Sequence, residues 1–531
     1  MYPLRRAPVG LLCWGRSPMF KRLLVCAALC CGLPAMVGCR SAQPESDTVV
    51  VLLENSPTSL DPRVGTDAVS EHLHELIFDG LVATDAQYNF MPSLAERWEE
   101  PDPLTYIFHL RPGVLFQDGR LLSSRDVAWT INSMRDGVVI SAKTNTYAAV
   151  TGIETPDAGT VIFHLSRPDN SLLENLTASA MGIVPYGSGK EFAQHPVGTG
   201  AFRFVSASMD QEVVLDANGR SWSGVPKIKR LRFAVVPDAN TRTLELEKGT
   251  ADISVNPTTM DTLPVLATKA NLAIEEAPGT VVQYLTFNTR DAALRDARVR
   301  RAIGFAIDRR LIIQTLLRGH ARPAESLLPA AHWAHWQSAA TNPAHIEYDP
   351  HRAEQLLDEA GYRRGADGMR FHTTLRTSTD ESARLLAAVL QQQLAGVGIA
   401  LNIQSNEFAT FYSDVVHGAF SIYTLRWVGG NEQPSIFSYA FATWREPPNG
   451  GNRGFYDNPK LDTLLREAEQ SGDQGLRKRD YAAVQRILLE DLPAINLWAQ
   501  NAIVVHTKRI AGIHPSPSGS MGFLKNAELA P

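Results

Sequence analysis

The chain has 531 residues, of which 44% are hydrophobic and 20% are charged, and its formal net charge at neutral pH is −5. This length exceeds what a single hydrophobic core supports, so two or three domains are expected. The mildly acidic balance, and the lack of any basic run interleaved with aromatic residues, exclude a nucleic-acid-binding surface.

The N-terminal segment has the pattern of an export signal. Lys21 and Arg22 precede an apolar stretch, residues 23–37, that is too short to span a membrane in the mature protein. Residues 36–39, Met-Val-Gly-Cys, resemble a bacterial lipobox, which implies cleavage before Cys39 and diacylglycerol on its thiol. An uncleaved signal anchor is the alternative. No disulfide can form after Cys39, because the cysteines are Cys13, Cys26, Cys30, Cys31 and Cys39.

We therefore assign residues 1–39 to a signal peptide with its lipobox. Residues 40–47 are polar and contain a proline, as in a flexible tether. Met19 begins a normal signal sequence by itself, so it is an alternative translation start to Met1. The expected location is periplasmic or at the cell surface, with a lipid anchor in a bacterial membrane.

The first half of the chain predicts alternating strands and helices. Residues 48–53 and 160–165 read as strands, and residues 105–110 alternate in a way typical of a hairpin strand. Ser123 followed three residues later by Asp126 is a helix start signal. Residues 231–236 and 251–253 are short strands that flank a helix over 241–248, and this β-α-β order implies parallel pairing.

The second half opens with a strand over 280–287 that we interpret as a crossing between two lobes. Asp308 and Asp349 are placed to cap the helices that follow them. A second β-α-β unit is expected, and a return crossing near the C-terminus places the last residues in the first lobe. The remaining predicted segments are helices 299–306, 382–394, 461–468 and 481–490, and strands 371–375, 399–403, 420–427, 495–498 and 503–505.

Several blocks of sequence, in this order, resemble the family 5 solute-binding proteins of ABC importers, the dipeptide, oligopeptide and nickel-binding group. The blocks are SLDPR…LIFDGLVATD from Ser59, TYIFHLRPGVLFQDGRLLSSRDVAWTIN from Thr105, PVGTGAF from Pro196 and YLTFNT…RVRRAIGFAIDR from Tyr284. The family's PVGTGPY element has proline where this chain has Ala201. The resemblance extends from about Ser59 to Leu497.

This resemblance implies a two-lobe α/β fold of the periplasmic-binding-protein type II, or Venus flytrap, with an extra subdomain in the first lobe. Lobe I is expected to comprise residues 48–284 and 499–531, with an inserted subdomain at about 93–196, and lobe II residues 285–498. The implied partners are a peptide or other small solute and the subunits of an ABC permease. A monomer without a cofactor is expected.

The predicted ligand-binding segment runs from Tyr423 to Pro434. It combines an aromatic wall, a cation and a pair of glycines at the end of a strand, as a cleft requires. In peptide-binding relatives a tryptophan here is followed by an aspartate that pairs with the α-ammonium of the peptide. Gly430 or Asn431 stands at that place in this chain, so Glu432 takes over or the ligand lacks that charge. The predicted ligand-binding residues are Tyr423, Arg426, Trp427, Gly430, Asn431, Glu432, Asn452, Arg453, Asn55 and Tyr147.

No catalytic or metal-binding motif is complete. Residues 187–190 lack the remaining positions of a phosphate-binding loop, and His72 and His74 do not form HExxH and read as a solvated helix face. The loop around His332 and His335 either lines a cleft or packs. We therefore predict a non-enzymatic protein. The alternatives are the same fold binding an oligosaccharide or a metal chelate, a secreted enzyme with an unrecognised site, and a structural lipoprotein with an empty cleft.

Overall fold

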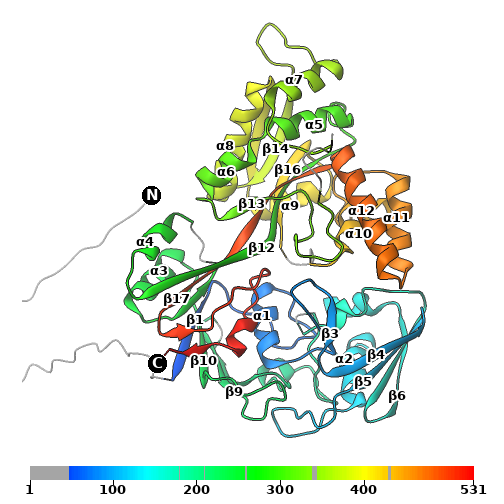
Figure 1. Ribbon diagram of the computed structural model, residues 1–531, viewed down its shortest axis with the longest axis vertical. Helices are drawn as coiled ribbons and strands as arrows, with labels where there is room; N and C mark the ends of the chain where they lie inside the picture. The colour runs from blue at the N-terminus through cyan, green and yellow to red at the C-terminus, as the bar shows by residue number, and fades with distance from the viewer. Residues whose placement is uncertain are drawn as a thin grey trace, which may run out of the picture. The chain divides into compact units, whose positions relative to one another are not determined.

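The computed structural model describes residues 47–178, 180–208, 210–256, 260–337, 342, 344–428 and 432–530. The signal sequence and Cys39 lie outside these residues. Residues 44–531 form one compact unit of mixed α/β structure (Figure 1). Within the described ranges, no helix is both long enough and apolar enough to cross a membrane.

A single large sheet runs through the whole unit. Its eleven strands include the path β15-β14-β16-β12-β17-β11-β1-β10-β9-β8, and β13 pairs with β17 beside this path. The strands are β1 (Thr48–Leu53), β8 (Phe202–Ser208), β9 (Glu212–Ala217), β10 (Arg230–Val235), β11 (Ile253–Val255), β12 (Leu272–Phe287), β13 (Ala321–Pro323), β14 (Phe371–Ser378), β15 (Ile399–Asn406), β16 (Ile422–Trp427) and β17 (Ala494–Thr507).

Two long strands, β12 and β17, join the two lobes. They pair in antiparallel fashion along most of their length, as Figure 1 shows in green and red. The predicted crossing and return are confirmed, although each strand is longer than expected. The register shifts between Ala277 and Val281. A Cβ atom at Gly279, within this bulge, would lie 2.0 Å from the carbonyl oxygen of Gln500, so the bulge requires glycine.

Lobe I packs its helices and the C-terminal segment around β1. Its core contains Val49, Phe233 and Leu524, so a residue near the end of the chain packs against β1 and β10. Strands β10 and β11 both run parallel to β1, which lies between them. The predicted parallel orientation is confirmed, but the two strands are not direct neighbours. The helices are α1 (Ala68–Ile77), α3 (Ala239–Lys248) and α4 (Leu263–Ala267), and the small strands are β2 (Val82–Thr84), β3 (Phe90–Pro92), β18 (Ile510–Ala511) and β19 (Glu528–Leu529).

An additional four-stranded sheet, in the order β4-β5-β7-β6, forms a subdomain with its own core. The Ser123–Asp126 capping box begins helix α2 as predicted. Gly198 and Gly200 return the chain against α1, where a Cβ atom at Gly198 would lie 2.0 Å from the carbonyl oxygen of Ile77. The elements are β4 (Ala95–Asp102), β5 (Thr105–Leu110), α2 (Ser124–Arg135), β6 (Val150–Asp157) and β7 (Thr160–Leu165).

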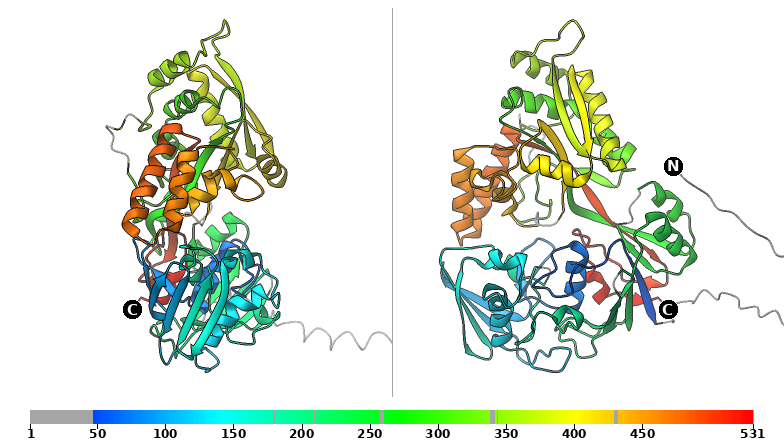
Figure 2. Two further views of the ribbon diagram at one scale, coloured as in Figure 1. Left: turned by 90° about the vertical axis from the view of Figure 1, so that its right-hand side faces the viewer. Right: turned by 180° about the vertical axis from the view of Figure 1, so that it is seen from behind.

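Lobe II contains the predicted second β-α-β unit, in which β14 and β15 are parallel. Asp308 and Asp349 cap helices α6 and α7 as expected. Figure 2 shows the orange helices α11 and α12 on the side of lobe II that lies toward the cyan subdomain. The helices are α5 (Ala297–Ala306), α6 (Arg309–Leu316), α7 (Pro350–Glu359), α8 (Glu381–Gly396), α9 (Phe408–Val416), α10 (Ile436–Phe441), α11 (Pro459–Gln470) and α12 (Gln474–Asp491).

Hydrophobic clusters show on which side the crossing residues pack. Val282 packs with Leu327 and Phe437, and Tyr284 packs with Phe411, and all of these partners belong to lobe II. The side chains of the crossing strand therefore join lobe II before residue 285. The lobe boundaries at 284/285 and 498/499 stay predictions.

Candidate functional site

The two lobes contact each other at separate places along the chain. The side-chain amide of Asn170, in the subdomain, donates to the carbonyl oxygens of Glu469 and Ser471 at 2.6 and 2.8 Å. The ring of Tyr88 stacks on that of His332, with their centroids 5.3 Å apart. The lobes are therefore closed against each other in this structure.

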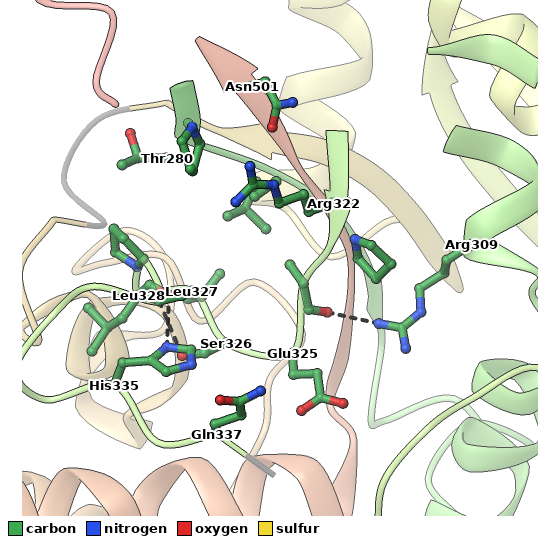
Figure 3. A pocket seen from close by; sticks show the side chains of 18 of the residues that line it. Thr280, Arg309, Arg322, Glu325, Ser326, Leu327, Leu328, His335, Gln337 and Asn501 are labelled. Atoms are coloured by element: carbon green, nitrogen blue, oxygen red, sulfur yellow. Dashed lines mark hydrogen bonds between the residues drawn. The ribbon is translucent and has the colours of Figure 1, made fainter. Parts of the chain in front are cut away.

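A cavity of about 1030 Å³ lies against the crossing strands, at the upper end of the usual range for ligand pockets. Lobe I contributes Tyr88 and Pro517, and the crossing strands contribute Thr280 and Asn501. Lobe II contributes α6, the segment from Glu325 to Ala331, and residues 345–348. Figure 3 shows labelled lining residues, among them Thr280, Glu325 and Asn501, around the open space beside β13 and β17. A solute in this cavity would contact both lobes and the strands between them.

Arg309 is the structural centre of one wall of this cavity. Its guanidinium donates to the carbonyl oxygens of Ala324, at 2.8 Å, and Asn496, at 3.2 Å, and also to that of Ile346. Through these hydrogen bonds Arg309 connects Ala324, directly after β13, with β17 and with the backbone at Ile346. Three N–H donors of Arg309 are therefore used by backbone carbonyl groups, which suits a residue that positions the wall.

The predicted aromatic wall exists, and its residues pack closely. Trp427 stacks on Tyr284 with ring centroids 5.2 Å apart and meets Tyr439 edge-on at 6.0 Å. Gly451 lies so close that a Cβ atom there would be 3.2 Å from the Trp427 ring. Tyr423 is buried beneath this layer. The space left among these residues is about 10 Å³, so a solute can meet this wall only from its outer face.

Arg453 is buried beside the aromatic wall. Its guanidinium lies 5.3 Å from the Tyr412 ring centroid and 5.8 Å from that of Trp427. It also donates to the hydroxyl of Tyr412 at 2.9 Å. Phe408 is half-exposed next to Tyr412, with which it stacks. Aromatic faces that hold a guanidinium in this way fix its position through cation–π attraction.

Glu432 lies at the margin of the large cavity. The hydroxyl of Thr280, which lines the cavity, donates to its carboxylate at 3.4 Å. Burial, together with the nearby carboxylate of Glu75 from lobe I, raises the pKa of Glu432 to about 7. A cationic group placed beside Glu432 would lower that pKa again. The position suits a group that binds an ammonium ion.

Two of the predicted ligand residues have other roles. Tyr147 is buried in the subdomain core, where its hydroxyl donates to the carbonyl oxygen of Asn175 at 2.6 Å. Asn452 is also buried, and its amide donates to the carbonyl oxygens of Ala442 and Tyr456. Because the polar groups of both side chains bond to backbone groups, we expect neither residue to contact a solute.

The other predicted positions are more exposed. Asn55 follows β1 at the surface, and the side chain of Arg426 points outward from β16. Gly430 and Asn431 lie outside the described residues. The histidines of α1 do not form a solvated face as expected, because His74 is buried and its Nε2 atom donates to the carbonyl oxygen of Ser59 at 2.9 Å. Burial lowers the pKa of His74 to about 3.

The sequence reasoning did not identify the residues around β13. Residues 321–337 have no helical or alternating period, and β13 has only three residues. The one available signal was the loop around His332 and His335, and His335 does line the cavity. Among the described residues, no group of three or more His, Cys, Asp or Glu side chains could hold a metal ion.

Two α/β lobes, joined by a pair of crossing strands and lining one cavity together, define a periplasmic-binding-protein fold of type II. The model of the bacterial extracellular solute-binding proteins, family 5, matches residues 89–449. The chain belongs to this family, and it is an extracytoplasmic solute-binding protein of an ABC importer. The resemblance stated from the sequence is therefore confirmed.

The chain is similar over nearly its whole length to a relative and to solved structures of other proteins. A glutathione-binding protein GsiB from Escherichia coli O1:K1 is 28% identical over 507 residues, which cover 93% of this chain and 96% of that protein. DppA from Helicobacter pylori, solved with the peptide STSA, has a TM-score of 0.72 and 25% identity over 91% of this chain and 98% of its own. HbpA2 from Haemophilus parasuis has a TM-score of 0.78 and 25% identity over 91% of this chain and 100% of its own.

Proposed function

We propose that this protein captures peptide-like solutes between its lobes and delivers them to an ABC permease. The observation that carries the proposal is the cavity of about 1030 Å³, which both lobes and the crossing strands line together. A molecule in that position makes contacts in the closed state that an open state cannot offer, so its binding favours closure. The named ligands of relatives, glutathione and a short peptide, support a solute of this class.

In this proposal Glu432 binds the α-ammonium of the solute, in place of the aspartate that the chain lacks. Its half-buried carboxylate at the cavity margin, with a pKa raised to about 7, would be stabilised in its charged form by an ammonium ion. Trp427 and Arg453 supply the wall of the site beyond Glu432. The residues proposed to contact the solute are therefore Glu432, Trp427 and Arg453. Gly430 and Asn431 lie between Trp427 and Glu432 in the sequence.

Native mass spectrometry of the protein, purified from its source cells and then exposed to a peptide digest, tests the proposed class of solute. We expect additional masses that match short peptides, recovered unchanged. Oligosaccharide or metal-chelate masses alone would contradict the proposal. Recovery of cleaved peptides would indicate an enzyme instead, whereas we infer that the protein binds without chemical conversion.

Titration with a free peptide and with its N-acetylated form tests the role of Glu432. We expect the free form to bind at least about tenfold more tightly than the N-acetylated form. The N-acetylated form leaves the buried carboxylate of Glu432 without a partner, which is costly. The Glu432→Gln variant should remove this difference. Equal affinity of the wild type for both forms would exclude Glu432 as the ammonium-binding group.

We also propose that the mature protein is a monomer anchored by lipid on Cys39, outside the cytoplasm. The lipobox-like residues 36–39 support this proposal. Metabolic labelling with a fatty acid should mark the wild type but not a Cys39→Ser variant. Labelling of both would contradict the anchor, and so would an intact mass that still contains residues 1–38.

A further inference from the structure

The contact between the subdomain and lobe II brings together carboxylates from both lobes. Glu174 lies in the subdomain, and its Oε2 atom accepts the hydroxyl of Ser435, the N-cap residue of α10, at 3.4 Å. Glu469 lies in the last turn of α11, and its backbone carbonyl oxygen accepts the side-chain amide of Asn170, from the subdomain, at 2.6 Å. Figure 2 shows α11 and α12 on the side of lobe II that lies toward the subdomain. Closing the lobes therefore removes water from both carboxylates.

The surroundings of this contact are predominantly acidic. Asp169, next to Asn170 in the chain, faces both Glu174 and Glu469. Glu432 of lobe II also faces Glu174. The last turn of α11 contains no basic residue, so the partial negative charge at the end of this helix adds to that of the carboxylates. Closure thus gathers like charges from the two lobes in one place.

Arg477 of α12 is the cation that faces both Glu174 and Glu469. Its guanidinium also lies 5.2 Å from the centroid of the Trp333 ring. The other titratable groups that face Arg477 or Glu469 are Glu100, Tyr106, Arg445 and Tyr481. In the described part of the chain, the carboxylates at this contact therefore outnumber the guanidinium groups that face them.

Protonation relieves this accumulation of negative charge. Burial raises the pKa of Glu174 from 4.5 to about 8 and also raises the pKa of Glu469, and the nearby Asp169 acts in the same direction on both. In an open state both carboxylates face water, so their pKa values return toward the ordinary range of glutamate. Ionised carboxylates therefore oppose closure at neutral pH, whereas protonated ones permit it.

We propose that closing the lobes takes up protons at Glu174 and Glu469, so that the protein closes more readily in acid than in alkaline solution. A group that binds protons more tightly in one state shifts the equilibrium toward that state as the pH falls. For Glu174 the favourable contribution to closure is complete below about pH 4.5 and is lost as the pH rises through about 8. The inference goes beyond the proposed function, because it does not depend on which solute is captured.

Small-angle X-ray scattering of the protein without solute, from pH 5 to pH 9, tests the proposal. Solute is left out because it would add its own effect on the titration of Glu432, and native mass spectrometry confirms that none is bound. We expect the radius of gyration to increase with pH, as the ratio of closed to open protein falls about tenfold or more between pH 5 and pH 8. In the double variant Glu174→Gln, Glu469→Gln this ratio should change less than about threefold, and Glu432 beside Glu75 accounts for the remainder.

Glu467→Gln is the matched control. Glu467 lies on the same helix, two residues before Glu469, but its side chain is exposed. The variant removes one negative charge from α11, and its scattering should follow the pH as that of the wild type does. A pH response that is weakened equally in the control and in the double variant would indicate an effect of net charge and overturn the proposal.

Two further results would overturn the proposal: a wild-type radius of gyration that is independent of pH, and a double variant that responds to pH as the wild type does. Either result would leave the proposed capture of peptide-like solutes untouched, because the measurement uses no solute. A thermal melt of each protein at pH 5 and at pH 9 shows that it is folded at the temperature of the scattering experiment. A change in the radius of gyration then reports on the lobes and not on unfolding.

Discussion

The ring of Tyr88 in lobe I stacks on the ring of His332 in lobe II, with their planes inclined by 28°. Beside this stack, the backbone N–H of Trp333 donates to the carbonyl oxygen of Gln87 at 3.3 Å. Burial lowers the pKa of His332 to about 4, so its ring is neutral at physiological pH. The stack joins the lobes only when they are closed, so it stabilises the closed state relative to an open state.

Replacing Tyr88 by alanine should shift the protein toward an open state. An aromatic pair contributes about 0.5–1.5 kcal/mol beyond its buried area. Where closure accompanies binding, this loss corresponds to about a twofold to tenfold weaker affinity for solute. Small-angle X-ray scattering of the ligand-free variant should show a larger radius of gyration than that of the wild type.

The control for this variant is Tyr186→Ala, which removes a half-exposed ring that contacts Trp129 within lobe I. It should leave both the scattering curve and the affinity unchanged. If Tyr88→Ala has no effect on either, the stack does not contribute to closure.

Gly279 is expected to be indispensable for the crossing strands. Because a Cβ atom there would lie 2.0 Å from the carbonyl oxygen of Gln500, Gly279→Ala must displace one of the two strands. Such overpacking costs about 1–3 kcal/mol or more of unfolding free energy. The midpoint of urea unfolding should fall accordingly. Gly152→Ala, where a Cβ atom meets no neighbour within 4 Å, should leave the midpoint close to that of the wild type.

Local patterns in the sequence predicted the elements, because the signals that specify them are local. Ser123 and Asp126 predicted a capping box from their spacing alone, and the alternation over 105–110 predicted buried and half-buried faces that strand β5 shows. The spacing of Asp308 from Leu311 likewise indicated the cap of α6, which the structure confirms. In each case the property depends on a few neighbouring residues.

The site was less predictable, because it depends on which side of a packed element faces the cavity. Tyr147 and Asn452 have the chemistry of ligand-binding residues. In the folded protein, however, both side chains are buried and donate hydrogen bonds to backbone carbonyl oxygens. The cavity residues around β13 carry no local signal, since that strand has only three residues. The lining of the cavity comes from segments that are distant in the sequence and are brought together only by the fold.

Glu174 should make the stability of the protein depend on pH. Its carboxylate accepts the hydroxyl of Ser435 across the lobe contact at 3.4 Å, and burial raises its pKa from 4.5 to about 8. A raised pKa in the folded state means that the contribution to stability is complete below about pH 4.5 and is lost as the pH rises through about 8. At alkaline pH the closed protein therefore holds an unfavourable buried charge.

The Glu174→Gln variant mimics the protonated acid and removes this dependence. Its melting temperature should exceed that of the wild type by a margin that grows between about pH 5 and pH 8 and then levels off. The exposed Glu191 provides the control, because Glu191→Gln should show no such trend. A constant difference between Glu174→Gln and the wild type across this range would show that Glu174 does not titrate in the folded state.

Asn452 is expected to be a stability residue rather than a ligand-binding one. Its amide donates to the carbonyl oxygen of Tyr456 at 2.8 Å, and its Oδ1 atom accepts the backbone N–H of the same residue at 3.0 Å. Asn452→Ala leaves these buried backbone groups without partners, at a cost of about 1–3 kcal/mol in unfolding free energy measured by urea denaturation. Exposed Asn449 in the same loop is the control, and Asn449→Ala should change the unfolding free energy by less than about 0.5 kcal/mol. At temperatures where Asn452→Ala is folded, its affinity for solute should match that of the wild type. A large loss of affinity with unchanged stability would instead show that Asn452 contacts the solute.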